Sequence, residues 1–400
     1  MEVYLDNNST TQMDPKVESV YIDYIKKFGN VNVIYNKGIE TRALLNDAYD
    51  KLYDGLGAED EDDIIITSST TEGNNTVIKT FLDLYLRDKE NEKNHIISTV
   101  AEHSSIKSPL KYCKSLGMDV TYVGTDVNGL INLEELENAI TDKTCLISVL
   151  TASNETGAVQ DIKAIAKIAQ KHDVKFHSDG AQAVGKMRID LADWGVDYFT
   201  FSAHKFHGPK GIGGLFIKGG APYNTLIHGA KNVMGGKRAG SLYNNGVAAM
   251  AKAVEIANIN IPLVEKTVQE LRDRLEEELL TIEDTKSYVP KEYRLKNLVA
   301  ISFRGVEGEA MLWDMNEHGI YLSTGSSCSS EDLEGSAVVE ALGEKTEIAN
   351  ATVMFALSKF TTDEEIDYVI EKVKSSVARI REISMTYAKQ EAFSAYVEEH

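Results

Sequence analysis

Residues 175–214 read KFHSDGAQAVGKMRIDLADWGVDYFTFSAHKFHGPKGIGG, and this stretch decides the fold. Its two short apolar runs, 174–176 and 197–203, each lead into a charged or polar cluster. Runs this short, rich in aromatic and β-branched residues and bounded by glycine, are typical of buried parallel strands. Because open α/β sheets carry their ligands at the carboxyl ends of the strands, we expect Asp179 and Lys205 to lie at the same edge of one sheet.

A carboxylate and an amine placed in this way suit pyridoxal phosphate. The lysine would form a Schiff base with the cofactor, and the aspartate would keep the pyridine nitrogen protonated so that the ring accepts electrons. The alternative is that Asp179 caps a helix and Lys205 is a surface residue. Either residue alone would favour that alternative, whereas the pair at one sheet edge favours the cofactor.

The composition is that of a globular protein with a marked acidic balance. Among 400 residues, 42 are Lys or Arg and 62 are Asp or Glu, which gives a net charge of −20. That charge argues against nucleic acid or an anionic membrane as the main partner, although it leaves room for a local basic surface. We find no run of 18 apolar residues, and MEVYLDNNSTT lacks the features of a signal peptide. We therefore expect a cytoplasmic protein without a membrane span.

Three cysteines, Cys113, Cys145 and Cys328, are too few and too scattered for a disulfide framework or a cysteine-rich metal site. Cys145 lies in an apolar run, as a structural cysteine usually does. Cys328 lies in the stretch STGSSCSS, where a thiol among serines and glycine is a candidate nucleophile. A structural role for Cys328 is the alternative.

Strand and helix patterns alternate from residue 64 onward, which predicts an α/β fold with a mostly parallel seven-stranded sheet flanked by helices. The run LFIKGG at 215–220 is expected to be an edge strand of this sheet. Five predicted strands end in polar clusters, and their convergence at one edge predicts a binding site. The clusters contain TSSTT, AEHS, SNETG, HSDG and SAHK.

Two of these clusters have alternative interpretations. The hydroxyl-rich stretch 67–75 leads from a strand into a helix, and free N–H groups at such a helix start bind phosphate. The same stretch, with Glu72 in the first turn, is also typical of a helix cap without a ligand. His103 suits stacking on a flat ring, but an isolated histidine in a turn needs no such role.

Pro262 interrupts the helical pattern that begins near residue 246 and marks a predicted domain boundary. We expect residues 15–258 to form a large cofactor-binding domain. Residues 1–14 and 259–400 would form a smaller α+β domain that carries the loop around Cys328.

The clusters together resemble the class V, fold-type I pyridoxal phosphate enzymes, and most closely the cysteine desulfurases. The resemblance extends along nearly the whole chain. The motifs that carry it are YLDNNSTT, TSSTTEGNN, AEHSSI, ASNETGAVQDI, HSDGAQAVGK, FSAHKFHGPKGIGG, STGSSCSS and KFTTDEEID. The HSDGAQ and SAHK pair and the cysteine loop are its specific parts.

The resemblance implies a role for each matching residue. Lys205 would form the Schiff base, Asp179 would contact the ring nitrogen, and His103 would stack on the ring and assist proton transfer. The implied contacts to the ring hydroxyl come from Gln182, with Asn154 beside it, and those to the phosphate from Thr70, Thr71, Ser202 and His204. Ser241 would reach the phosphate of a neighbouring subunit, which implies a homodimer. No metal is implied.

The implied activity is the removal of sulfur from L-cysteine, which gives alanine and a persulfide on Cys328. The persulfide sulfur would pass to an acceptor or an iron–sulfur scaffold protein, for iron–sulfur clusters or thio-cofactors.

The departures from the family pattern concern the substrate side. Met354 stands where the family has an arginine for the substrate carboxylate, and the segments 29–35 and 229–233 also differ. Methionine offers no bidentate contact to a carboxylate. The candidate replacement cations are Arg238, Arg42 and Lys231. The alternatives are therefore a lyase or transaminase for another amino acid, such as a selenocysteine lyase, and a non-catalytic sulfur-relay subunit.

Overall fold

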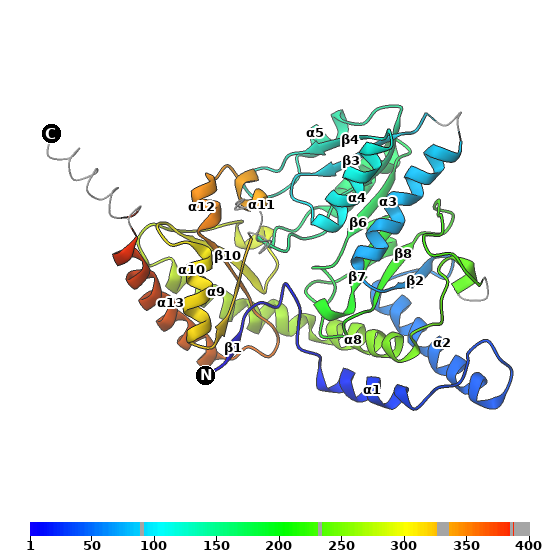
Figure 1. The fold of residues 1–400 in the computed structure, drawn as a ribbon, viewed down its shortest axis with the longest axis horizontal. Coiled ribbons are helices and arrows are strands. Elements are labelled where there is room, and N and C mark those ends of the chain that lie inside the picture. Colours follow the sequence, from blue (N-terminus) through cyan, green and yellow to red (C-terminus); the bar gives the residue numbers. More distant parts are fainter. Residues whose placement is uncertain (89–91, 231–233, 326–335, 385–386, 388–400) are drawn as a thin grey trace.

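The structure is a computed structural model that describes residues 1–88, 92–230, 234–325, 336–384 and 387. The chain folds into a large part built on a seven-stranded sheet and a smaller part with its own sheet (Figure 1). Cys328, Lys231 and the tail after 387 lie outside the described residues.

The large sheet has the strand order β2-β8-β7-β6-β5-β3-β4. Its strands are β2 (Asp63–Thr67), β3 (His95–Thr99), β4 (Asp119–Val123), β5 (Thr144–Ser148), β6 (Lys175–Asp179), β7 (Tyr198–Ser202) and β8 (Gly213–Ile217). Only β8 runs against the other strands, so the prediction of a mostly parallel seven-stranded sheet is confirmed. The expectation that 215–220 forms an edge strand is wrong, because β2 pairs with the outer side of β8.

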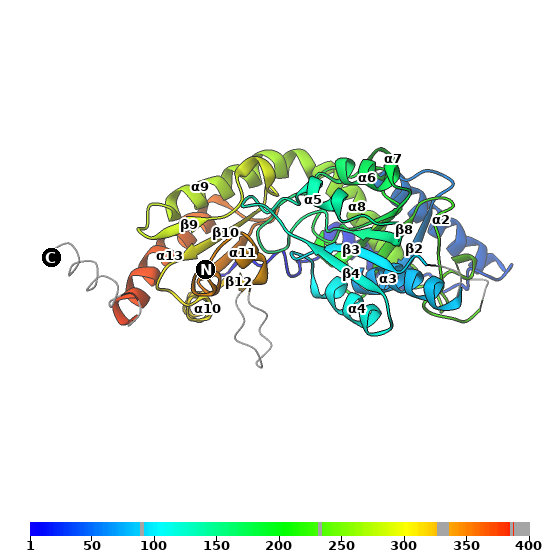
Figure 2. The ribbon, with the colours of Figure 1, turned by 90° about the horizontal axis from the view of Figure 1, so that it is seen from above.

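Helices cover both faces of this sheet (Figure 2). One face carries α1 (Pro15–Ile25), α2 (Asn36–Leu56), α5 (Leu133–Asn138), α6 (Ile162–Lys171), α7 (Leu191–Trp194) and α8 (Asn244–Leu263), and the other carries α3 (Thr70–Arg87) and α4 (Ser104–Ser115). The run Ile64–Ile65–Ile66 in β2 shows why its sequence is continuously apolar. Ile64 and Ile66 join one core and Ile65 the other, since successive side chains of a strand point to opposite faces.

The smaller part is an α+β arrangement, as predicted. Its antiparallel sheet contains β9 (Thr285–Ser287), β10 (Leu298–Phe303), β12 (Ser323–Thr324) and β13 (Thr352–Ala356). Strand β1 (Val3–Tyr4) pairs with β11 (Ile320–Tyr321), which brings the N-terminus to this part. The helices are α9 (Gln269–Leu279), α10 (Gly308–Glu317), α11 (Ala337–Ala341), α12 (Thr346–Asn350) and α13 (Asp363–Ile383).

A single helical rod joins the two parts. Helix α8 continues past Pro262 through a π-helical turn, Val264–Val268, into α9, so the expectation that Pro262 ends the helix is wrong. The π turn lies just after the proline, where the regular hydrogen-bond pattern is interrupted. The rod contains an apolar window with a mean hydropathy of 1.4, long enough for a membrane span, but 56% of that window is buried inside the protein. More than half of this window is therefore covered by the protein itself. The division at residue 258 stays a prediction.

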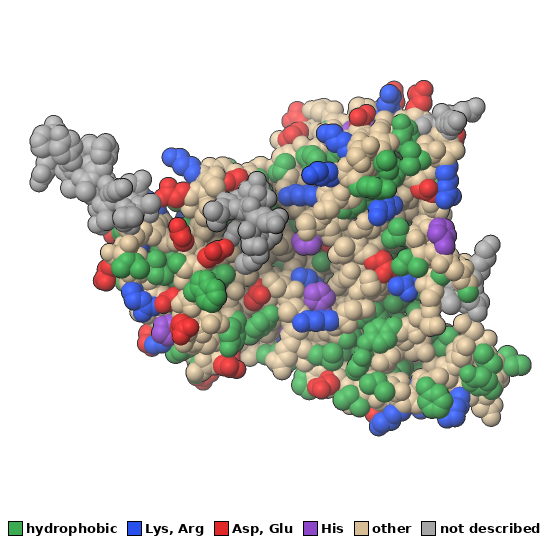
Figure 3. Space-filling view, in the orientation of Figure 1, with side chains coloured by type: hydrophobic (Ala, Val, Ile, Leu, Met, Phe, Trp, Pro, Cys, Tyr) green, Lys and Arg blue, Asp and Glu red, His purple; other side chains and the backbone are tan. Residues whose placement is uncertain are grey.

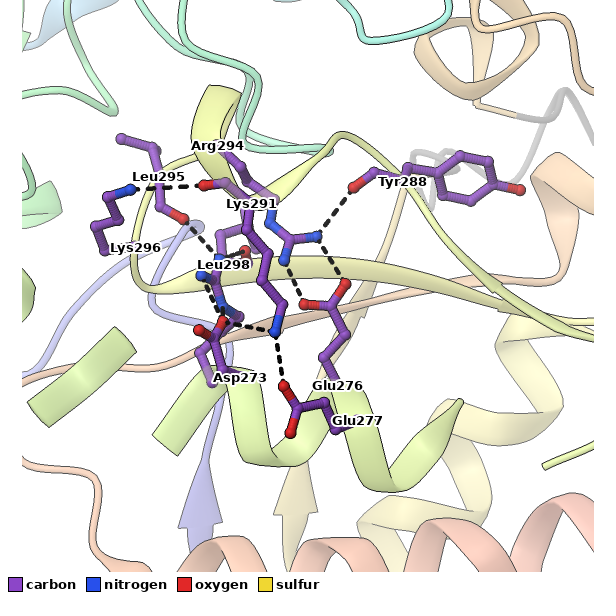
Figure 4. A network of polar contacts seen from close by, with 10 residues as sticks. Asp273, Glu276, Glu277, Tyr288, Lys291, Arg294, Leu295, Lys296 and Leu298 are labelled. Carbon is purple, nitrogen blue, oxygen red and sulfur yellow. Dashed lines mark hydrogen bonds and ion pairs between the residues drawn. The ribbon is translucent and has the colours of Figure 1, made fainter. Parts of the chain in front are cut away.

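A buried ion pair between Glu276 and Arg294 connects α9 to the segment that precedes β10 (Figure 4). The Arg294 guanidinium is fully buried and donates to both carboxylate oxygens of Glu276, one of them at 3.2 Å. Leu295 N donates to Gly157 O at 2.9 Å, and Val159 N donates to Tyr293 O at 2.8 Å. The ion pair therefore supports the backbone that holds the SNETG segment of the large part.

We expect Glu276→Gln to lower the free energy of unfolding by about 3–5 kcal/mol, because it leaves the Arg294 charge buried without its anion. Urea denaturation followed by circular dichroism measures this loss. The matched control is Glu277→Gln, since Glu277 is 70% exposed where it pairs with Lys291, and we expect a change below about 1 kcal/mol. Equal losses in the two variants would contradict this role for the buried pair.

Candidate active site

Lys205 lies at the end of β7, in a short 3-10 turn, with its amine turned toward the N-terminal segment. Its Nζ donates to Asn8 O at 2.7 Å and to Ser9 O at 2.8 Å. Burial lowers the pKa of the Lys205 amine, while the charges of Asp179 and Asp6 act in the opposite direction. A lowered pKa favours the neutral amine that attacks a carbonyl group.

Asp179 ends the neighbouring strand β6, whose register places it opposite Thr200 of β7. Asp179 and Lys205 thus lie at one sheet edge, as predicted. The carboxylate accepts from Ala181 N at 3.0 Å and from Asn74 Nδ2 at 2.8 Å. Burial raises the pKa of Asp179, and the two hydrogen bonds and the Lys205 charge act against that rise.

Asn74 is a site residue that sequence reasoning missed. It is fully buried on the inner face of α3, where it also accepts from Thr200 Oγ1 at 2.6 Å and donates to Ser105 Oγ at 2.9 Å. Its position four residues after Thr70, on one face of the predicted helix, was the available signal. Asn74 fixes the Asp179 carboxylate relative to α3 and α4.

His103 caps the start of α4. Its Nδ1 accepts from Ser105 N at 3.1 Å, and burial of the ring lowers its pKa. An Nδ1 atom that accepts a hydrogen bond leaves the ring proton on Nε2, so the imidazole is neutral. The ring therefore caps a helix, a role that the sequence had not indicated, and the same ring lines a cavity beside Thr71.

The start of α3 provides the surface for an anion. Thr70 N donates to Ser202 Oγ at 2.6 Å, and the two hydroxyls lie 2.7 Å apart, so the start of α3 meets the end of β7 there. The Ser69 side chain makes no capping bond to the helix, although Glu72 accepts from Ser68 N at 2.7 Å. N–H groups at an uncapped helix start favour phosphate.

A cavity of about 380 Å³ opens between the starts of α3 and α4 and is lined by Thr71, Asn75, Lys79, His103, Ser108 and neighbouring residues.

His204 follows Ser202 and contacts Thr10 Oγ1 at 3.1 Å, and burial lowers its pKa to about 4. Figure 3 shows histidine, lysine and arginine side chains gathered at the centre of one face, between the two parts. This surface is cationic on an otherwise acidic protein.

Asn8 is the second residue that sequence reasoning missed. Its carbonyl oxygen accepts from Lys205 and, at 2.8 Å, from Gln182 Nε2, and its Nδ2 donates to Asn154 O at 2.8 Å. Asn8 is buried, and its Oδ1 has no hydrogen-bond partner among the described residues. The signal was the polar run DNNSTT directly after a strand. Asn8 joins three of the predicted cofactor residues.

Ser241 stands apart from this cluster. It is exposed in the segment before α8, and within the described residues it makes none of the contacts that join the others.

The ends of the segment that contains Cys328 meet at Glu155. Ser336 Oγ donates to Glu155 Oε2, and a β-carbon at Gly325 would collide with the same oxygen. Burial of this carboxyl raises the pKa of Glu155 to about 7. The chain therefore leaves and rejoins the described structure beside Asn154, at the edge of the site.

Met354 is buried, and its Sδ accepts from Asn8 Nδ2 at 3.5 Å. The two described replacement cations are engaged elsewhere. Arg42 donates to Val31 O at 2.7 Å, and Arg238 pairs with Glu72 at 3.0 Å. Met354 therefore lies in a hydrophobic cluster beside Asn8, and the two described candidate cations bind other partners.

The residues present fit pyridoxal phosphate. The amine and the carboxylate lie on adjacent strand ends, a neutral imidazole lines the neighbouring cavity, and the start of α3 has free N–H capacity. The partnerless Asn8 oxygen marks a place where a ligand would complete the hydrogen bonding.

Comparison with known proteins gives one consistent result. A family model described as aminotransferase class-V matches residues 3–369. The cysteine desulfurase IscS of Dictyoglomus turgidum is 36% identical over 386 residues, covering 96% of each chain. Cysteine desulfurase 2 of Trichormus variabilis is 40% identical over 384 residues, covering 96% of this chain and 94% of the relative.

Solved structures agree in the fold. A NifS-like protein has a TM-score of 0.88 at 33% identity and covers 94% of this chain and 100% of its own. SspA in complex with cysteine has a TM-score of 0.77 at 26% identity, covering 90% and 100%. The protein is therefore a fold-type I enzyme that depends on pyridoxal phosphate. Since the family model and both relatives span nearly the whole chain, the chain belongs to the aminotransferase class-V family.

Proposed function

We propose that the protein is a cysteine desulfurase that takes sulfur from L-cysteine and carries it as a persulfide on Cys328. The observation that carries this proposal is the joint placement of Lys205 and Asp179 at one strand edge, in a chain 40% identical to a cysteine desulfurase along 96% of its length. The similar structure of SspA in complex with cysteine supports the choice of substrate.

When bound, pyridoxal phosphate supplies an electron sink for negative charge that develops at the substrate Cα. Lys205, whose pKa is lowered by burial, would hold the cofactor through its amine and would accept the Cα proton of the substrate. Asp179 keeps the ring nitrogen protonated, and His103 covers the ring. The start of α3, with Thr70, Thr71, Ser202 and His204, holds the phosphate.

In the transfer of sulfur from the substrate, we assign the nucleophile to Cys328. Burial raises the pKa of Cys113 to about 11 and that of Cys145 to about 12, so neither forms a thiolate at neutral pH. Cys328 remains as the nucleophile. Its sulfur attacks the substrate sulfur, an S–S bond forms as the C–S bond breaks, and the electron pair of the broken bond stays with the substrate. Protonation of the substrate then gives alanine.

Met354, which stands where the resembled family has an arginine, favours a second candidate function, a lyase for a different amino acid such as selenocysteine. The holoenzyme is incubated with L-cysteine, L-cystine and L-selenocysteine in the presence of a thiol reductant, and alanine, sulfide and selenide are measured. We expect equal amounts of alanine and sulfide from L-cysteine. Alanine from selenocysteine alone, or a keto acid product, would replace the desulfurase assignment.

We also propose a homodimer in which Ser241 completes the partner's phosphate site. Large apolar side chains are exposed around α1 and the start of α2, and Figure 3 shows them gathered there. Phe28 is 75% and Ile34 85% exposed. Apolar surface of this kind is typical of an interface.

The double variant Phe28→Asp with Ile34→Asp is expected to weaken the dimer by at least about tenfold, because each change places a charge in the apolar contact. Light scattering after size exclusion measures the mass. The matched control is Trp313→Asp, because Trp313 is 72% exposed on α10 in the other part. A dimer that persists in the double variant at low micromolar concentration would place the interface elsewhere.

We further propose that the protein is cytoplasmic. Its partner would be a sulfur-acceptor protein or an iron–sulfur scaffold protein. The relatives that carry the name IscS support a sulfur-transfer role, and Cys113 and Cys145 are free thiols, as a reducing compartment maintains them.

A further inference from the structure

Lys186 is a buried lysine that forms no ion pair with a carboxylate of the described residues. The residue is 7% exposed in the turn after β6, where its backbone N–H donates to Ala183 O at 3.0 Å. Lysine is rarely buried unless it is paired, because removing an ammonium group from water is costly. A methionine would fill similar space without that cost, so the amine at this position needs another explanation.

Within the described residues, the hydrogen bond of the amine goes to the carboxamide of Gln182. Lys186 Nζ donates to Gln182 Oε1, and Gln182 Nε2 donates to Asn8 O at 2.8 Å. The same carbonyl oxygen accepts from Lys205 Nζ at 2.7 Å. The hydrogen bonds thus run from Lys186 through Gln182 to the backbone that also holds the cofactor lysine. Lys186 and Lys205 line one small cavity of about 30 Å³ at the junction of the two parts.

This contact determines which end of the carboxamide faces the cofactor side. An amide has one accepting end and one donating end, whereas lysine offers only donors when charged. Lys186 therefore holds Oε1 toward itself and turns the NH₂ group of Gln182 toward Asn8 and Lys205. That NH₂ group has two hydrogens, and Asn8 O takes one of them. The second remains for a ligand.

We propose that Lys186 is a positioning residue that orients the Gln182 carboxamide, so that its NH₂ group is presented to the ring oxygen of the cofactor. The inference rests on the proposed function, in which Gln182 contacts that oxygen. It adds the requirement that the contact depends on Lys186.

Burial, together with the Lys205 charge, lowers the pKa of Lys186 to about 7. A charged amine offers only donors and therefore holds Gln182 Oε1 toward itself, whereas a neutral amine can also accept a hydrogen bond.

The test is a pH titration of the visible absorbance of the holoenzyme in Lys186→Met. A donor to the ring oxygen stabilises the deprotonated form of the bound cofactor most, because that oxygen then carries its full negative charge. Loss of the oriented donor is expected to raise the pH at the midpoint of this absorbance titration by about 0.5–1 unit. The matched control is Lys210→Met, an exposed lysine that also lowers the pKa of His204, and we expect no shift.

A double-mutant cycle separates orientation from charge. If Lys186 acts through Gln182, adding Lys186→Met to Gln182→Leu produces no further shift, because the carboxamide is already absent. Additive shifts would mean that Lys186 acts through its charge, and would overturn the proposal. Lys186→Gln keeps a donor and is expected to shift the midpoint by less than half as much, which provides a second variant if Lys186→Met folds poorly.

Failure of this inference differs from failure of the proposed function. No shift in Gln182→Leu would remove the proposed contact of Gln182 with the ring oxygen. A shift in Gln182→Leu with none in Lys186→Met or Lys186→Gln would overturn the role of Lys186 alone.

Discussion

Lys205→Ala is expected to abolish the visible absorption band near ~420 nm and to eliminate alanine formation. Lys205 is the amine at the sheet edge, and the carbonyl groups of Asn8 and Ser9 hold it 2.7 and 2.8 Å away. Alanine at this position removes both the covalent attachment of the cofactor and the base for the Cα proton. The spectrum of the purified protein and an alanine assay with L-cysteine measure the two effects.

Lys210→Ala is the control for this change, because Lys210 lies five residues later in the sequence and is exposed. It should retain the band and the activity. A Lys205→Ala protein that keeps both would exclude Lys205 as the attachment site.

Cys328→Ser is expected to reduce sulfide release from L-cysteine to the level of the protein-free control. It is also expected to leave the enzyme without the extra sulfur atom of a persulfide, which mass spectrometry measures. A hydroxyl at this position is a far weaker nucleophile than a thiol. The segment that contains Cys328 leaves and rejoins the described structure at Gly325 and Ser336, both against Glu155. Its ends are therefore held at the edge that carries Asn154.

Cys113→Ser and Cys145→Ser serve as controls, since burial raises the pKa of both thiols far above neutrality. Both variants should transfer sulfur normally. Unchanged turnover in Cys328→Ser would rule out the persulfide route through this residue.

Much of the site was predictable because its residues follow strands. Asp179 and Ser202 end β6 and β7, and Lys205 and His204 occupy the next turn, so short apolar runs with a polar end were enough to place them at one edge. The start of α3 was predictable in the same way, from hydroxyl residues between a strand and a helix. Which residues fill the family roles remains a proposal.

The errors have a common origin in long-range pairing. The position of β8 inside the sheet depends on β2, which lies about 150 residues earlier in the chain, and no local pattern contains that information. The continuity of the helix through Pro262 depends on packing along both parts, which offsets the local cost of proline.

The residues that sequence reasoning missed share this origin. Asn8 contacts Gln182 across 174 positions, and Asn74 contacts Asp179 across 105. Lys186 could not be distinguished from a surface lysine, because its burial is a property of the folded chain.

By itself, the sequence determined the sheet type and the strand ends that carry Asp179 and Lys205, because short apolar runs with polar ends are local properties of the chain. The pairing of these two residues and the resemblance to a known family implied the cofactor. Only the tertiary structure decided how those groups are held: Asn74 against Asp179, Asn8 against Lys205, and Lys186 against Gln182. The reason is that a hydrogen bond acts over about 3 Å in space, whatever separation its partners have along the chain.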